Sequence, residues 1–333
     1  MKKRATLSDV AKVAGVTMMT VSRAINNKPG VSAELRQKIV NIANEIDYQP
    51  NQIARGLATN QTRTVGLVVP DNTNPFFAQI ARGVEDSAYE SGYNIFLINT
   101  AEDTAREKAA LDSLWGKGVD GLILCSSRLP AKRLKNEVER FSASVLLNRE
   151  LNIPNRTTIS INLNDQKAGK LAVEHFIDHG KRCLAYLNGP SNSFSGQRRL
   201  EGFKMGLEMA KLSFDECYIG ESAPDTLSGY KATQELLTAH PEIDAIYAFN
   251  DLVAVGALQY CLEIGKKIPE EIAIIGNDDI PLASIIRPQL TTLHFNQNYI
   301  GRLVMRTLLE ILSGQALPRT ILIEPELCSR ETA

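Results

Sequence analysis

Apolar residues change their spacing near residue 64, and this change divides the chain into two parts. In the first part they recur every three or four positions, which is the period of an amphipathic helix. From Val65 onward, short apolar runs alternate with longer helical segments. The expected domains are a headpiece at 1–50, a connecting segment at 51–63, and a larger domain at 64–333.

Polar residues beside the first apolar segments predict three short helices. Thr6 and Asp9 are spaced like a capping box, and Gly15 is typical of a helix end. Thr17 can cap a second helix, and Ser32 can cap a third. Two short helices joined by a glycine turn indicate a helix-turn-helix, whose second helix enters the major groove of DNA.

The outer face of the second helix would carry both polar and apolar side chains. Its outward side chains are expected to be Thr17, Met18, Met19, Ser22, Arg23 and Asn26. Arg23 can reach a guanine edge or a phosphate, while Thr17 and Ser22 can donate to phosphates. The two methionines offer only apolar contact, for example to thymine methyl groups.

Strand and helix segments alternate in the larger domain. The expected strands are 65–69, 94–98, 121–124, 144–147, 158–161, 183–187, 245–248, 272–275 and 320–323. The expected helices are 76–90, 104–115, 165–179, 198–212, 229–239, 252–262 and 297–312. This alternation predicts an α/β fold of two lobes, each a doubly wound parallel sheet, with a ligand site at the carboxyl ends of the strands.

The residues that follow the strands are suited to a polyol. Amides, carboxylates and two guanidinium groups occur there at Asn74, Asn148, Arg149, Arg199, Asn250, Asp251 and Asp278, with Phe76 and Phe77 beside the first of them. Polar groups of these kinds can hold hydroxyls, and an aromatic ring can cover the apolar face of a sugar.

Charge is distributed unevenly along the chain. Residues 1–63 contain ten Lys or Arg and four Asp or Glu, whereas the remainder contains 27 basic and 34 acidic residues. A basic head of +6 on an acidic body of −7 indicates a nucleic-acid-binding module joined to another domain. We find no long apolar run or secretory signal, and the five cysteines form no C-x-x-C pair, so we expect a cytoplasmic protein with free thiols.

The segment from Thr6 to Asn26 resembles the headpiece of the lac repressor (LacI/GalR) family. The resemblance continues through Val31-Ser32, 48–51 and 54–57. The larger domain resembles the same family and, more distantly, periplasmic sugar-binding proteins. It carries their motifs Asn-Pro-Phe-Phe at 74–77, Arg199 with Gly202-Phe203, Asn250-Asp251, and Gly276-Asn277-Asp278.

The resemblance implies two sets of site residues and a hinge. DNA contacts would come from Thr6, Thr17, Met18, Met19, Ser22, Arg23, Asn26, Asn51, Ala54, Leu57 and Ala58. Effector contacts would come from Asn74, Phe76, Phe77, Ser126, Asn148, Arg149, Phe194, Arg199, Asn250, Asp251 and Asp278. Residues 51–57 would form a hinge helix on DNA, with Leu57 wedged into the minor groove. The lobes would be 64–161 plus 293–319 and 162–292 plus 320–333, joined by three crossings.

These observations predict a repressor of carbohydrate-metabolism genes that acts as a homodimer on palindromic, double-stranded operator DNA in the bacterial nucleoid. A small sugar-like effector between the lobes would release the operator. A nucleotide-like corepressor, which would tighten DNA binding, is the alternative for the effector. A sugar-transport binding protein and an α/β enzyme are the alternatives for the chain, and the basic head disfavours the first.

No catalytic, cofactor or metal site is expected. Gly116 to Gly121 satisfies G-x-G-x-x-G, but it follows a helix and precedes a strand, the reverse of a dinucleotide fingerprint. His175 and His179 have a spacing that can bind a metal, but they lack a third ligand, so a solvated helix face is the simpler interpretation.

Overall fold

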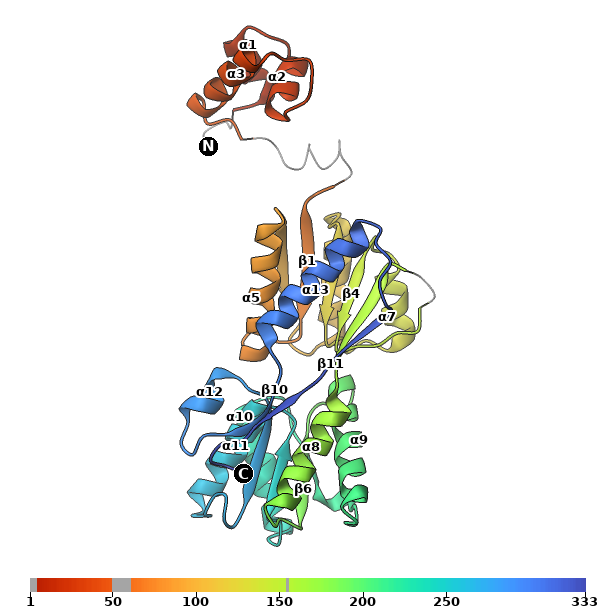
Figure 1. The fold of residues 1–333 in the computed structure, drawn as a ribbon, viewed down its shortest axis with the longest axis vertical. Coiled ribbons are helices and arrows are strands. Elements are labelled where there is room, and N and C mark those ends of the chain that lie inside the picture. Colours follow the sequence, from red (N-terminus) through yellow and green to blue (C-terminus); the bar gives the residue numbers. More distant parts are fainter. Residues whose placement is uncertain (1–4, 50–60, 154–155) are drawn as a thin grey trace. The chain divides into compact units, whose positions relative to one another are not determined.

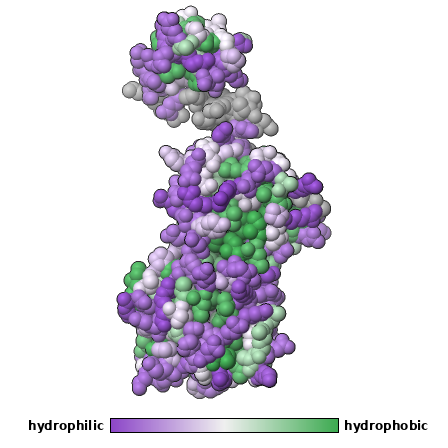
Figure 2. Space-filling model, in the orientation of Figure 1, coloured by the Kyte–Doolittle hydropathy of each residue, from purple (hydrophilic) through white to green (hydrophobic). Residues whose placement is uncertain are grey.

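The computed structural model describes residues 5–49, 61–153 and 156–333. The chain falls into two compact units, Met1–Thr62 and Arg63–Ala333. No helix in the described part is long and apolar enough to cross a membrane. Figure 2 shows mainly hydrophilic residues over the headpiece, and apolar patches on the face of the larger unit that it presents.

The headpiece consists of helices α1 (Leu7–Ala14), α2 (Met18–Ile25) and α3 (Ala33–Glu45) around one small core. Val10, Val21 and Ile39 are fully buried where the three helices meet. The predicted caps are confirmed. Thr6 and Asp9 form a capping box, Gly15 ends α1 in the left-handed conformation, and Thr17 and Ser32 cap the next two helices.

The first lobe is a parallel sheet in the order β11-β5-β4-β3-β1-β2. Its strands are β1 (Thr64–Val69), β2 (Asn94–Asn99), β3 (Gly121–Cys125), β4 (Ser144–Leu147), β5 (Thr158–Leu163) and β11 (Thr320–Ile323). Its helices are α5 (Pro75–Glu90), α6 (Thr104–Gly116), α7 (Ala131–Val138) and α13 (Gln297–Leu312). The central strands are continuous apolar runs because helices cover both faces of the sheet.

The second lobe has the sheet order β12-β10-β9-β8-β6-β7, parallel except for β12, the last strand in the sequence, which runs antiparallel to β10. Its strands are β6 (Leu184–Asn188), β7 (Ile219–Glu221), β8 (Ala245–Ala248), β9 (Ala273–Asp278), β10 (Thr291–His294) and β12 (Glu326–Cys328). Its helices are α8 (Asp165–Asp178), α9 (Phe194–Met209), the 3-10 turn η1 (Glu216–Tyr218), α10 (Thr226–Ala239), α11 (Asp251–Glu263) and α12 (Pro281–Ile285).

The chain crosses between the lobes three times, as the resemblance implied (Figure 1). The crossings lie between β5 and α8, between β10 and α13, and between β11 and β12. The prediction that 320–333 belongs to the second lobe was wrong for residues 320–323. β11 pairs in parallel with β5, with Thr320 opposite Ser160, and therefore extends the first sheet.

All nine expected strands and seven expected helices are present, with small shifts at their ends. The prediction missed β7, β10, β12, α7 and α12. The three strands have only three or four residues, and their pairing with longer neighbours holds them extended. α9 also begins four residues earlier than expected, at Phe194, because Ser193 caps it.

Helices α8 and α9 approach closely through small residues. A Cβ atom on Gly202 would collide with the backbone carbonyl of Gln166, and one on Gly169 would collide with the carbonyl of Arg199. Glycine at both positions therefore lets the two backbones touch. This contact places Arg199 of α9 beside Asp165 of α8, and that pair lies at the candidate site.

Candidate functional site

The outer face of α2 is exposed in the way that a DNA-reading helix requires. Met18 and Met19 have exposed fractions of 55% and 67%, which is unusual for large apolar side chains. Arg23 is exposed on the same helix, and Ser22 is half-buried. The helix thus presents two apolar side chains and one cation, a combination that can contact base edges and phosphates.

The polar residues at the helix ends are partly engaged in capping. The Thr17 hydroxyl accepts from the Thr20 amide at 3.2 Å, and the Thr6 hydroxyl donates to Asp9 at 2.7 Å. The Asn26 amide donates to the Ser22 carbonyl at 2.9 Å. These residues set where each helix begins or ends, and Thr6, Thr17 and Asn26 stay exposed beside the outer face of α2 or at the start of α1.

Sequence reasoning missed Arg36, which holds the end of α2. Its guanidinium donates to the carbonyl oxygens of Ala24 at 2.7 Å and Lys28 at 2.8 Å. A cation that satisfies the last carbonyls of a helix also complements the helix dipole. The remaining predicted DNA contacts, at Asn51, Ala54, Leu57 and Ala58, lie outside the described residues.

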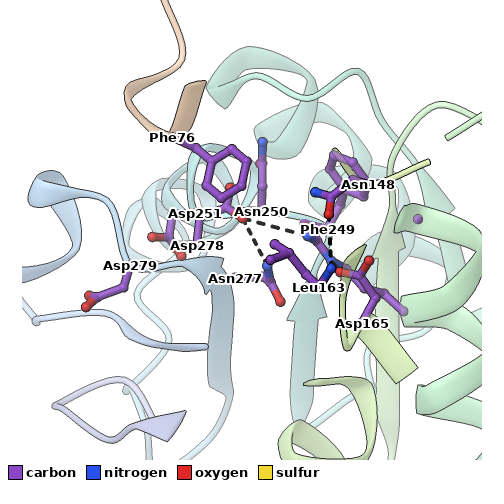
Figure 3. A network of polar contacts seen from close by, with 12 residues as sticks. Phe76, Asn148, Leu163, Asp165, Phe249, Asn250, Asp251, Asn277, Asp278 and Asp279 are labelled. Carbon is purple, nitrogen blue, oxygen red and sulfur yellow. Dashed lines mark hydrogen bonds and ion pairs between the residues drawn. The ribbon is translucent and has the colours of Figure 1, made fainter. Parts of the chain in front are cut away.

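The larger unit contains a pocket of about 460 Å³, including its opening to solvent. This volume is in the range of small-molecule sites. Eight predicted effector residues line it: Asn74, Phe76, Phe77, Ser126, Asn148, Arg199, Asn250 and Asp278. The first five come from the first lobe and the last three from the second, so the pocket lies between the lobes (Figure 3).

Arg199 is the buried centre of the second-lobe wall. Its Nε donates to Asp165 Oδ1 at 2.8 Å, Nη1 donates to the Phe249 carbonyl, and Nη2 lies 3.8 Å from Asp278 Oδ1. The guanidinium also stacks over the Phe249 ring, 5.2 Å from its centroid. These contacts fix the plane of the guanidinium, which leaves a rigid cation at the pocket floor.

Asp278 faces the same space from the end of β9. Its Oδ1 accepts from the Asn277 amide at 3.0 Å, and the side chain is almost completely buried. Its backbone has φ +125°, a conformation that residues other than glycine rarely adopt. Burial raises the pKa of Asp278, and Arg199 offsets this only partly because the guanidinium already pairs with Asp165.

The first-lobe side of the pocket carries two asparagine side chains and two phenylalanine rings. Asn74 caps α5 by accepting from the Phe76 amide at 3.0 Å, and Asn148 accepts from the Leu163 amide at 3.2 Å. Each side-chain amide therefore has its oxygen engaged within the protein, and its nitrogen is the group that can donate to a ligand. The Phe76 and Phe77 rings meet edge to face, with centroids 5.1 Å apart.

Three predicted effector residues do not line the pocket. Asp251 accepts from Ile280 N at 2.8 Å and from Thr292 Oγ1 at 2.5 Å, so it joins the loop after β9 to strand β10 within the second lobe. Asn250, not Asp251, caps α11. Arg149 donates to the Leu129 carbonyl and stacks at 5.7 Å on the Phe194 ring, which removes both side chains from the pocket wall.

Seven lining residues were missed: Asp71, Glu102, Arg128, Ser193, Ser195, Pro224 and Phe249. Most of them follow a strand by a few positions, so the rule used for the other residues could have found them. Glu102 and Arg128 form an ion pair at 2.5 Å that joins two strand-end loops of the first lobe. Such a pair is hard to foresee because its partners are distant in the sequence.

Comparison with known proteins points to the same family for both parts of the chain. Residues 6–51 match the family described as bacterial regulatory proteins, lacI family. Residues 62–331 match the family described as periplasmic binding proteins and sugar binding domain of LacI family.

Individual relatives cover nearly the whole chain. The ribose operon repressor of Halalkalibacterium halodurans is 36% identical over 94% of this chain and 92% of that protein. The transcriptional repressor PurR of Haemophilus influenzae is 33% identical over 98% of both chains. The solved structure of the lac repressor dimer bound to operator and the anti-inducer ONPF has a TM-score of 0.90 and 27% identity, covering 99% of each chain.

Proposed function

This chain belongs to the LacI family of DNA-binding transcription regulators, and we propose that its inducer is a monosaccharide, specifically a pentose such as D-ribose. The observation that carries the proposal is the mixed lining of the interlobe pocket. Charged and amide groups from both lobes surround a space that two phenylalanine rings bound on one side. The similarity to a ribose operon repressor favours a pentose among the sugars.

The lining residues have complementary roles toward such a ligand. Arg199 would donate to ring or hydroxyl oxygens, and Asp278 would accept from hydroxyls. Asn74 and Asn148 would donate from the opposite lobe. The ring of Phe76 would cover the apolar face of the sugar. A ligand that contacts both lobes stabilises their closed arrangement by its difference in affinity for the two states.

On the DNA side, we infer a homodimer that reads a palindromic operator. The similarity to the lac repressor dimer supports this assembly. The exposed face of α2 would enter the major groove, with Arg23 at a guanine or phosphate and Met18 and Met19 against apolar base edges. Asn51, Ala54, Leu57 and Ala58 would contact the minor groove and its phosphates. Such a regulator acts on the nucleoid in the cytoplasm, by binding rather than by catalysis.

The switch would operate through the hinge segment. Residues 51–57 are too few to form a stable helix alone. Lobe closure in a dimer would change the spacing of the two hinge segments, and a small change could decide whether they fold on DNA. Inducer binding would then withdraw Leu57 from the minor groove and release the operator.

A binding screen followed by an operator assay tests the proposal. Purified full-length protein would be screened by thermal shift against pentoses, hexoses and nucleosides, because a ligand of the native state raises the melting temperature. Operator affinity would then be measured by gel shift with each ligand that binds. Release of the operator by a pentose is the expected result. Tightening by a nucleoside would support a corepressor, and failure of all sugars to bind would refute the sugar assignment.

A further inference from the structure

Three side chains that can bind a metal meet behind the effector pocket. Asp279, His294 and Cys328 bring one carboxylate oxygen, one imidazole nitrogen and one thiol sulfur within 4.8 Å of one another. His294 Nδ1 lies 2.8 Å from Asp279 Oδ2, and Cys328 Sγ lies 3.9 Å from the same oxygen. In Figure 3, Asp279 points away from the pocket residue Asp278, so the cluster is separate from the effector site.

The second sheet brings these residues together from three strands. Asp279 directly follows β9, His294 ends β10, and Cys328 ends β12. In the antiparallel pair, Thr292 is opposite Cys328 and His294 is opposite Glu326, so His294 and Cys328 are diagonal neighbours on one face. β9 lies on the other side of β10, which places Asp279 beside His294.

Two of the three separations between the ligand atoms are close to those of a tetrahedral zinc site, and the third is below 4.8 Å. With Zn–N and Zn–O near 2.0 Å and Zn–S near 2.3 Å, ligand atoms are separated by about 3.3 to 3.6 Å. The N–O separation here is shorter than that and the S–O separation longer, each by about half an ångström or less. Small side-chain rotations would bring both into range.

A second contact orients the carboxylate. Arg330 Nη2 lies 2.6 Å from Asp279 Oδ1, the oxygen that does not face the histidine. This ion pair leaves Oδ2 directed at His294 and Cys328. Ligating carboxylates are commonly held by such an outer partner. The His294 and Asp279 side chains keep exposed fractions of 33% and 16%, so solvent can supply a fourth ligand.

We propose that Asp279, His294 and Cys328 bind a divalent transition metal, with zinc as the best match to an oxygen, nitrogen and sulfur set. Two of these residues adjoin interlobe crossings. His294 precedes the crossing into α13, and Cys328 follows the crossing from β11. A bound ion would therefore tie two crossings together beside Asp278, and it would link metal binding to the movement of the lobes.

The test uses cobalt as a spectroscopic substitute for zinc. Full-length protein is freed of metal with a chelator and titrated with Co²⁺, and absorption from thiolate-to-cobalt charge transfer is recorded. Zinc affinity is then measured by displacement of the cobalt. The variants are Cys328→Ser and His294→Gln, and the matched control is Cys217→Ser, which alters an exposed cysteine elsewhere in the second lobe.

The wild type and Cys217→Ser are expected to show the thiolate band, and Cys328→Ser is expected to lose it. His294→Gln should keep a thiolate contact but lower zinc affinity by about 100-fold, since even outer partners of a metal site contribute about 10- to 100-fold. Circular dichroism checks that each variant is folded. Absence of the band in the wild type, its survival in Cys328→Ser, or its loss in Cys217→Ser would overturn the proposal.

Discussion

Replacing Asp278 by asparagine should separate effector binding from folding stability. The wild-type cluster buries two carboxylates, Asp165 and Asp278, around the single guanidinium of Arg199. Asparagine keeps the shape of the side chain and removes one negative charge. Arg199 retains its 2.8 Å contact with Asp165, so no buried charge is left unpaired. The usual penalty for breaking a buried ion pair therefore does not apply.

The sign of the stability change follows from the pKa of Asp278. Burial raises this pKa from 3.8 to about 8, and the neighbouring carboxylate of Asp251 adds to the rise. A carboxyl group whose pKa is raised in the folded state contributes stability below about pH 4, and that contribution is lost as the pH rises to about 8. Within this window the free energy of unfolding can change by at most about 1.4 kcal/mol for each pH unit. Between about pH 5 and pH 7 the free energy of unfolding of the wild type should fall by on the order of 2 kcal/mol, and that of Asp278→Asn should not show this fall.

Effector binding should change in the opposite direction. Above about pH 8, where Asp278 is ionised, its hydrogen bond to an effector hydroxyl is charge-assisted and contributes about 1.5 to 3 kcal/mol, which corresponds to about a 10- to 150-fold loss of affinity in Asp278→Asn. The variant should bind the operator normally and require far more effector to release it. A site that functions at the expense of stability commonly shows this pairing of effects.

Denaturant unfolding at a series of pH values provides the measurement, with effector titration of the same preparations. Glu235→Gln, which changes an exposed carboxylate on α10, is the control and should follow the wild-type curve. Parallel stability curves for the wild type and Asp278→Asn would refute the burial argument. An unchanged effector concentration for operator release would refute the pocket assignment.

Three further predictions concern other parts of the molecule. Arg23→Ala should weaken operator binding in gel shifts by about 1–3 kcal/mol and leave effector binding unchanged. If the variant and the wild type bind the operator with equal affinity at the same salt concentration, Arg23 is not part of the interface. Removal of residues 1–62 should abolish operator binding, while the remaining unit Arg63–Ala333 should still unfold cooperatively; a molten product would contradict its independence. Gly202→Ala should lower the free energy of unfolding by about 1–3 kcal/mol, because the added carbon forces α8 and α9 apart. Gly116→Ala should not lower it, because no atom lies within 4 Å of the added carbon. Equal melting temperatures for the two variants would argue against the close helix contact.

Local patterns in the sequence determined most of the fold. Helix caps such as Thr6, Thr17 and Ser32 act within three or four residues, so the sequence alone predicts where these helices begin. The long apolar strands are equally local, because a strand that is covered on both faces must be apolar throughout. The rule that ligands bind at the carboxyl ends of parallel strands then placed seven predicted effector residues at one pocket, and the family resemblance added Ser126.

Features that depend on partners distant in the sequence were not predictable in this way. The four-residue strand β11 could extend either sheet, and only its pairing with β5 assigns it to the first lobe. Asn250 and Asp251 are adjacent polar residues at a strand end, and both suit a ligand. Successive positions at the start of a helix point in different directions, so Asn250 faces the pocket and Asp251 turns toward Thr292.

The cluster of Asp279, His294 and Cys328 shows the same limit most clearly. No sequence spacing connects three residues from positions so far apart, and each one alone is an ordinary loop or strand-end residue. They meet because β10 lies between β9 and β12, an order set by long-range strand pairing. The sequence by itself therefore determined the elements and the edges where their polar residues gather, because these depend on neighbouring residues. Tertiary structure alone decided which side chains share a site, because that depends on how distant strands pair.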